Sequence, residues 1–187
     1  HHLQMQLIQN QILKPLKNIV TSQKTQQRNK LRGFMPLFFC YNILGRGDFM
    51  DMKLERVNKT AYRVVTDDGI EIFMDSHRPE SEKALGGTPM ELTLASLMGC
   101  TSMVVNAILR KMRIEKYTYS MKAEAKNEDE VPGKFIYIKL FYIFKGKDLN
   151  KEKIEKAVSK SHEKYCPVAG MLKQALKIDY EIKYEEE

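Results

Sequence analysis

The sequence of 187 residues has only three cysteines, no tryptophan and no uninterrupted run of about 18 apolar residues. Three cysteines are too few for a disulfide framework, and no segment resembles a secretory signal with a cleavage site. The missing apolar run argues against a membrane partner. These absences predict a cytoplasmic protein that keeps a few selected thiols reduced.

Acidic residues are nearly missing from the first fifty positions, where seven Lys and Arg accompany a single acid, Asp48. Most of the formal net charge of +7 therefore lies in residues 1–50, and the rest of the chain is close to neutral. We expect residues 1–50 to be a leader, a tag or an upstream-derived extension, and residues 51–187 to be the domain. A nearly neutral domain predicts no nucleic-acid partner.

From residue 51 onward, short apolar and β-branched segments alternate with helical patterns. Asp67-Asp68-Gly69 predicts a hairpin turn inside an antiparallel three-stranded meander. In 134–145 both alternating faces are apolar, which indicates a strand enclosed on both sides. The whole order predicts an α+β domain with few parallel crossovers, with strands at 53–58, 61–66, 70–75, 117–126, 134–145 and 178–184 and helices at 88–109, 151–165 and 168–176.

The helix at 88–109 carries the clearest start signal of the chain. Thr88, a proline at the next position and Glu91 form a capping-box pattern. Apolar residues lie on nearly every side of the helix that follows, and a helix that is apolar all round is buried all round. We expect it in a core or at a subunit interface.

Two cysteines of the domain lie in different settings. Cys100 is inside the central helix, where burial alone would raise its pKa. Cys166 precedes a proline, and if that proline begins a helix, the thiol lies at the positive end of the helix dipole, which lowers a thiol pKa. Either cysteine can also be a simple packing residue, because free cysteine is among the most buried residue types.

His162 lies one helical turn before Cys166, and two interpretations are open. The pair can be a nucleophile with its base, or the histidine can lie on a solvated face, which the pattern favours. Together with Cys100 these residues could supply three zinc ligands, but the spacing that makes such sites recognisable is missing. We expect no bound metal and no cofactor.

Glu91 and Cys100 cannot meet on one helix. Nine residues rotate the helix by about 900°, half a turn out of phase, and raise it by about 13 Å. If the carboxylate and the thiol cooperate, they do so across two copies of the helix, which implies a dimer.

The segments 87–102 and 161–169 read GTPMELTLASLMGCTS and SHEKYCPVA. This pair of motifs resembles the osmotically inducible protein C / organic hydroperoxide resistance (OsmC/Ohr) family. The residues of the two motifs are most similar to those of its OsmC-like branch. The resemblance implies an intertwined homodimer in which two long central helices pack back to back and antiparallel sheets wrap around them.

The resemblance also implies a thiol-dependent peroxidase in oxidative stress defence. Cys100 matches the peroxidatic cysteine, and Cys166 matches the resolving cysteine, whose disulfide with Cys100 a dithiol then reduces. Glu91 matches, at or within one position, an acidic residue of the partner subunit that orients an arginine at the thiol. For that arginine, Arg63 lies next to the equivalent strand, while Arg56 and Arg78 compete with it.

Two function classes follow. The first is reduction of organic hydroperoxides or peroxide by the two cysteines, in an apolar pocket formed by the central helix and the aromatic strand. The alternative is a non-catalytic dimer that binds a small apolar or thiol-reactive ligand, with the cysteines as packing residues.

Overall fold

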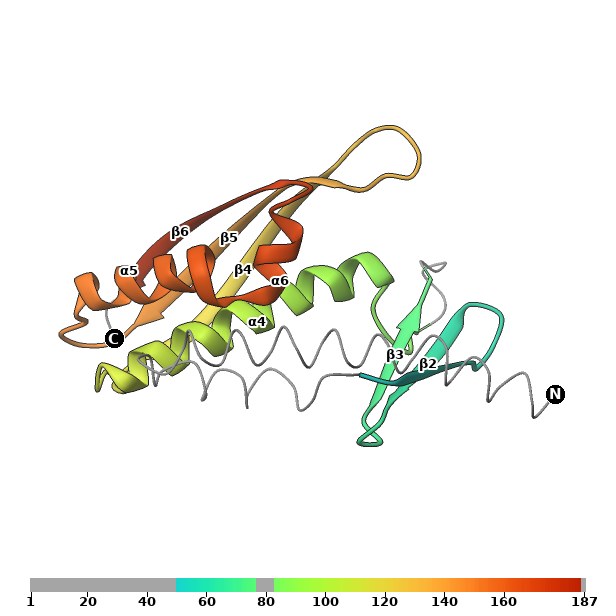
Figure 1. Cartoon of the computed structure of the whole chain (residues 1–187), viewed down its shortest axis with the longest axis horizontal. Coiled ribbons are helices and arrows are strands. Elements are labelled where there is room, and N and C mark those ends of the chain that lie inside the picture. Colours follow the sequence, from blue (N-terminus) through green and yellow to red (C-terminus); the bar gives the residue numbers. More distant parts are fainter. Residues whose placement is uncertain (1–49, 77–82, 186–187) are drawn as a thin grey trace, which may run out of the picture. The chain divides into compact units, whose positions relative to one another are not determined.

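The computed structural model describes residues 50–76 and 83–185 (Figure 1). Residues Asp51–Glu187 form one compact unit with three strands, a long helix, two strands, a helical region and a last strand. The predicted α+β class is confirmed. Residues 1–49, with Cys40, lie outside the described part of the chain, so the separate leader stays a prediction.

The first sheet is an antiparallel meander. It consists of β1 (Met52–Arg56), β2 (Ala61–Thr66) and β3 (Glu71–Asp75), with β2 between the other two. The turn between β2 and β3 lies where the sequence predicts it, at Gly69, whose φ of 79° suits a residue without a Cβ. The strand bounds agree with the prediction to within two residues.

The central helix, α4 (Pro89–Lys111), begins behind the predicted capping box. The Glu91 N–H donates to Thr88 Oγ1 at 3.2 Å, and the Thr88 N–H donates to the Glu91 carboxylate at 2.7 Å. Two N–H groups that the first turn leaves without helical partners are thereby satisfied. The largest buried side chains of α4 are apolar: Leu97, Val104, Val105 and Leu109.

By length and composition alone, α4 is also apolar enough to cross a membrane. An 18-residue window of it reaches a mean hydropathy of 1.7, and 39% of that window is buried inside the protein. Core helices of globular proteins meet the same criterion. In this chain α4 packs against α5 (Lys151–Lys160) and α6 (Pro167–Leu172).

The second sheet consists of β4 (Thr118–Asn127), β5 (Phe135–Lys145) and β6 (Lys177–Glu185), with β5 in the middle. β4 and β5 pair antiparallel, but β5 and β6 pair parallel. Among the described strands this is one parallel pair, in line with the few parallel crossovers that the element order predicts; the antiparallel sheets that the resemblance implies describe β4 and β5 but not β5 and β6. The chain between β5 and β6 forms a helical crossover, which is the kind of connection that parallel neighbours need.

The two faces of β5 have different surroundings. On the inner face Tyr142 and Phe144 are fully buried, and the helical elements lie on this side of the sheet (Figure 1). On the outer face Phe141 is 9% exposed and lies under the ammonium groups of Lys139 and Lys183, 4.8 and 4.9 Å from its ring centre. Lysine side chains cover an apolar ring in this way because their stems are apolar.

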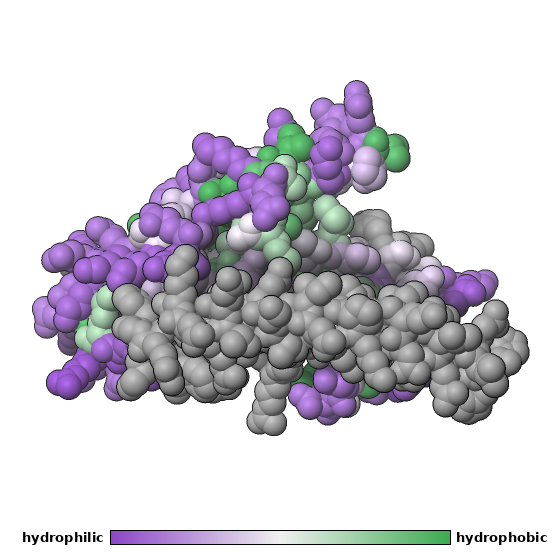
Figure 2. Space-filling view, in the orientation of Figure 1, coloured by the Kyte–Doolittle hydropathy of each residue, from purple (hydrophilic) through white to green (hydrophobic). Residues whose placement is uncertain are grey.

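The expected enclosure of β5 by apolar material on both faces is therefore wrong for the described chain. Its outer face has ion pairs such as that of Lys139 with Glu181, at 2.7 Å. Around α5 the surface in Figure 2 is also hydrophilic, because five of the ten residues of this helix are exposed lysines and glutamates.

The segment 151–165 is not one helix as predicted. α5 ends at Lys160, and the next five residues, Ser161–Tyr165, form a π-helical turn. α6 then begins at Pro167, one residue earlier than predicted, and ends at Leu172, four residues earlier. A π-turn widens the backbone and changes the direction of the residues that follow it. Its effect is to bring Cys166 to α4.

Candidate active site

The thiols of Cys100 and Cys166 face each other at the centre of the helical layer. Their Sγ atoms are 2.9 Å apart, with the Cys166 thiol donating to the Cys100 sulfur. The side chains are 7% and 4% exposed, and both cysteines are in the reduced form. Residues 66 positions apart in sequence thus form one buried pair.

Three contacts hold Cys166 in this place. Its backbone N–H donates to the Ser161 carbonyl at 2.9 Å and closes the π-turn. The Ser161 hydroxyl donates to the Thr101 carbonyl at 3.2 Å, which ties the turn to α4 beside Cys100. The Ala169 N–H donates to Cys166 Sγ at 3.4 Å, so that the cysteine caps α6. The helix start at Pro167 is confirmed. The lowered pKa that this position predicts for Cys166 is wrong, because the hydrogen bond to Cys100 and burial raise it.

The two thiols differ in acidity because they play opposite parts in one hydrogen bond. Donation from Cys166 lowers the pKa of Cys100 to about 7; burial acts in the opposite direction, and the Val168 N–H supports the lowering. Donation to Cys100 raises the pKa of Cys166, and burial raises it further. Near neutral pH a large share of Cys100 is therefore thiolate, whereas Cys166 stays a protonated thiol.

Glu91 lies far from Cys100 within one chain, as the helical phase predicts. Its carboxylate lies in the first turn of α4, where it accepts the Thr88 N–H, and its residue is exposed within one chain. One copy of α4 does not bring it to Cys100. Whether a second copy does so stays a prediction.

Arg63 lies on β2 and pairs with two carboxylates of its own sheet. Its guanidinium nitrogens are 2.6 Å from the Glu55 carboxylate and 2.8 Å from that of Glu71. Arg56 donates to the backbone carbonyls of Asn58 and Lys59. Within one chain, neither arginine contributes to the lowered pKa of Cys100. Arg78 lies outside the described residues.

His162 is not on a solvated face, as the pattern favoured, but is 3% exposed. Its Nε2 is 2.7 Å from the hydroxyl oxygen of Tyr142, and its ring stacks on Tyr180 with ring centres 4.5 Å apart. Burial lowers the pKa of His162 to about 4, and the charge of Lys173 contributes. The predicted pairing of His162 with Cys166 as base and nucleophile assumed the four-residue spacing of an α-helix. That spacing does not apply in the π-turn, whose residues are rotated relative to those of an α-helix.

Sequence reasoning missed Tyr142 and Ser161 as parts of this site. Tyr142 was assigned only to an apolar strand face, and Ser161 only to an amphipathic helix. Their polar groups act on partners 20 and 60 positions away, so no local pattern identifies them.

Among the described residues, no three His, Cys, Asp or Glu side chains are grouped as a metal site. The zinc set considered from the sequence is not assembled, because His162 directs Nε2 to Tyr142 rather than to the two sulfurs.

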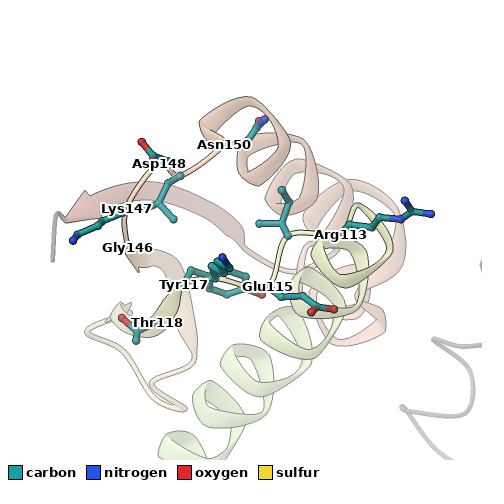
Figure 3. Close-up of a pocket in the computed structure, with 11 residues that line it drawn as sticks. Arg113, Glu115, Tyr117, Thr118, Gly146, Lys147, Asp148 and Asn150 are labelled. Carbon is teal, nitrogen blue, oxygen red and sulfur yellow. The ribbon is translucent and has the colours of Figure 1, made fainter.

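A groove of about 860 Å³ lies apart from the thiols, at the end of α4. Figure 3 shows that its lining comes from the α4–β4 connection, with Arg113 and Glu115, and from the β5–α5 connection, with Lys147 and Asp148. Both signs of charge line it, and it contains none of the predicted site residues.

Fold and site together define an α+β protein with two thiols poised against each other between a central helix and a π-turn. The chain belongs to the OsmC-like protein family, whose model matches residues 81–181 and so includes both cysteines. Several of its structural neighbours are described as organic hydroperoxide resistance or redox proteins.

Three similar proteins give the range of the relationship. Protein YhfA of Escherichia coli K12 is 36% identical over 112 residues, which are 60% of this chain and 81% of YhfA. The crystal structure of a hypothetical protein from Aquifex aeolicus has a TM-score of 0.61 at 32% identity, over 74% of this chain and 99% of that one. The organic hydroperoxide resistance protein OhrB of Bacillus subtilis shares the fold at 20% identity, with a TM-score of 0.50 over 72% of this chain and 98% of OhrB.

Proposed function

We propose that the protein is a thiol-dependent peroxidase that reduces organic hydroperoxides or peroxide through a two-cysteine cycle. The Cys100 thiolate attacks the outer oxygen of ROOH, the O–O bond breaks, and RO⁻ takes a proton and leaves as ROH. Cys100 becomes a sulfenic acid. The Cys166 thiol then displaces hydroxide from this sulfur, so that water leaves and a disulfide remains. A dithiol reductant returns both thiols and is itself oxidised to a disulfide.

The observation that carries the proposal is the 2.9 Å contact between the two sulfurs, with its direction of donation. A peroxidatic cysteine must be a thiolate at neutral pH, and donation from Cys166 favours that form of Cys100. A resolving cysteine must lie within reach of the sulfenic acid, and Cys166 is in contact with the sulfur that would carry it. Both requirements are met by one hydrogen bond.

The surroundings of Cys100 favour organic over inorganic peroxide. The neighbouring buried positions on α4, Leu97 and Val104, carry apolar side chains. An alkyl group that reached these fully buried side chains through an opening of the site would gain free energy, whereas hydrogen peroxide would not.

We further propose that the active unit is a homodimer in a reducing cytoplasm, and that Glu91 of one subunit orients Arg63 at the thiol of the other subunit's site. The phase of Glu91 relative to Cys100 supports the dimer. Arg63 already pairs with the Glu55 and Glu71 carboxylates, so a role at the thiol would use the remaining N–H groups of its guanidinium.

Stopped-flow consumption of cumene hydroperoxide and hydrogen peroxide by the reduced full-length chain tests the proposal. Cys40→Ser serves as the background, because it removes the third thiol. We expect fast loss of cumene hydroperoxide that disappears in Cys100→Ser. In Cys166→Ser we expect one turnover, trapping of the sulfenic acid by dimedone and no intramolecular disulfide.

Arg63→Met and Arg56→Met, compared in the same assay, identify the activating cation. Loss of activity in Arg63→Met alone supports its proposed role. Slow oxidation that is indifferent to both cysteine substitutions would overturn the peroxidase proposal and favour the non-catalytic ligand-binding dimer.

A further inference from the structure

A second polar cluster lies next to the thiol pair. It consists of two buried residues, His162 in the π-turn and Tyr142 on β5, and of Tyr180 on β6, which stacks on His162 and is 39% exposed. The His162 Nε2 and the Tyr142 hydroxyl are hydrogen-bonded at 2.7 Å, and the Tyr142 ring meets the His162 ring edge-on, with ring centres 5.7 Å apart. His162 Nδ1 is buried and has no partner in the structure. Burying 97% of a polar ring costs free energy, so a function for His162 is expected.

The cluster is connected to the thiols through the backbone of the π-turn. Ser161, adjacent to His162, accepts the Cys166 N–H with its carbonyl and donates its hydroxyl to the Thr101 carbonyl. The Lys173 ammonium donates to the His162 carbonyl at 2.9 Å. The turn is thus held by α4 through Ser161, by the sheet through the His162 ring, and by the end of α6 through Lys173.

The His162 ring makes no hydrogen bond to either sulfur. Nε2 is engaged with Tyr142, and burial keeps the ring neutral. It therefore has neither the position nor the charge to activate Cys100 directly. Any effect of this ring on the thiols must pass through the position of the turn, and so through Cys166.

We propose that His162 and Tyr142 form a positioning pair that holds the π-turn against the sheet and so keeps the Cys166 thiol donating to Cys100. The inference rests on the proposed function for its purpose, but its geometry concerns only the reduced protein. Without the pair, the turn relaxes toward the regular helix that the sequence of 151–165 favours. Cys166 then withdraws, and the thiolate of Cys100 loses the hydrogen bond from the Cys166 thiol, which is the main cause of its lowered pKa.

The test measures how the rate of Cys100 alkylation by iodoacetamide depends on pH, in the full-length Cys40→Ser chain under reducing conditions. Mass spectrometry of a Cys100 peptide follows the reaction, and no peroxide is present. For His162→Ala and Tyr142→Phe we expect the midpoint of the profile to move up toward that of an ordinary thiol. At pH 7 the thiolate fraction, and with it the rate, then falls roughly tenfold.

His162→Gln is the conservative variant, because its side-chain amide reaches the same place as Nε2 and can still bond the Tyr142 hydroxyl. It should restore most of the wild-type profile. Tyr137→Phe is the matched control: it removes a hydroxyl from the same strand, but from the outer face, where that hydroxyl binds Asp179. Its profile should equal that of the parent chain.

A double-mutant comparison separates positioning from a general loss of structure. If His162 acts through Cys166, then adding His162→Ala to Cys166→Ala leaves the Cys100 profile where Cys166→Ala alone puts it. A folded His162→Ala protein with an unchanged profile, or an equal further shift without Cys166, would overturn the proposal. Failure of the peroxidase assay alone would leave these alkylation results unaffected, so the two hypotheses fail separately.

Discussion

Between about pH 4 and pH 6.5 burial keeps His162 neutral, whereas a solvent-exposed histidine is charged there. In the unfolded chain its pKa is near 6.5, whereas burial lowers the folded pKa to about 4. Between these values the unfolded state binds the extra proton, so stability rises with pH across this window. The contribution of neutral His162 is fully present above about pH 6.5 and is lost as the pH falls toward 4.

Urea denaturation at pH 7 and pH 4.5 measures this contribution. We expect the His162 part of the loss in unfolding free energy to be about 2–3 kcal/mol. Carboxylates titrate over the same range, so the informative quantity is the difference between the wild-type chain and His162→Gln, which cannot titrate there. If the unfolding free energy falls by the same amount in both proteins, the titration of His162 does not contribute to the acid sensitivity of the fold.

At the same scale, the residues that sequence could identify are those whose chemistry is local. The two cysteines stand out by type and by motif, and the Thr88 cap by its spacing to Glu91. The acidity of Cys100 could not be predicted, because its cause is a hydrogen bond from a residue 66 positions away. His162 was misjudged for the same reason: its partner lies on β5.

Among the elements, α4 offers the most direct test, because its first turn holds both a cap and a proposed site residue. Thr88→Ala removes one half of the capping box, and we expect it to lower the unfolding free energy by about 1 kcal/mol. Thr93→Ala is the matched control, since Thr93 lies inside the helix, bonds only the Pro89 carbonyl and is replaced by a better helix former. It should cost little or nothing.

Glu91→Gln separates the two parts that Glu91 can play. Glutamine also serves at this position of a capping box, so stability should be nearly unchanged. If the carboxylate orients a cation at the thiol of the partner subunit, peroxide consumption falls while the denaturation midpoint stays. Unchanged peroxide consumption in a folded Glu91→Gln protein would mean that Glu91 serves the helix alone.

The elements also show where pattern reasoning ends. Strands and α4 were predicted closely because periodicity, caps and turn residues act within a few positions. The π-turn was not, because the amphipathic pattern of 151–165 is continuous and the contacts that open the turn come from α4 and β5. The parallel pairing of β5 and β6 likewise depends on how the crossover packs, which no single strand encodes.

For the whole domain, the thiol pair links elements that are distant in the chain. A disulfide between Cys100 and Cys166 would close a loop of 66 positions and tie α4 to the start of α6. Since the sulfurs are already 2.9 Å apart, closing them to a disulfide length of about 2.05 Å needs only a small shift of the two side chains. The folded state should therefore accept the bond with little strain.

Oxidation should consequently stabilise the domain rather than distort it. In the chain-entropy account, a loop of this size contributes about 4 kcal/mol, because the cross-link restricts the unfolded chain. We expect the urea midpoint of the oxidised full-length chain to exceed that of the reduced chain, while Cys166→Ser shows no dependence on redox state. A lower midpoint after oxidation would mean that the bond forces α4 and the π-turn apart from their reduced arrangement. In that case the resolving step requires a local opening of the π-turn, and the peroxidase cycle includes a conformational change at Ser161–Tyr165.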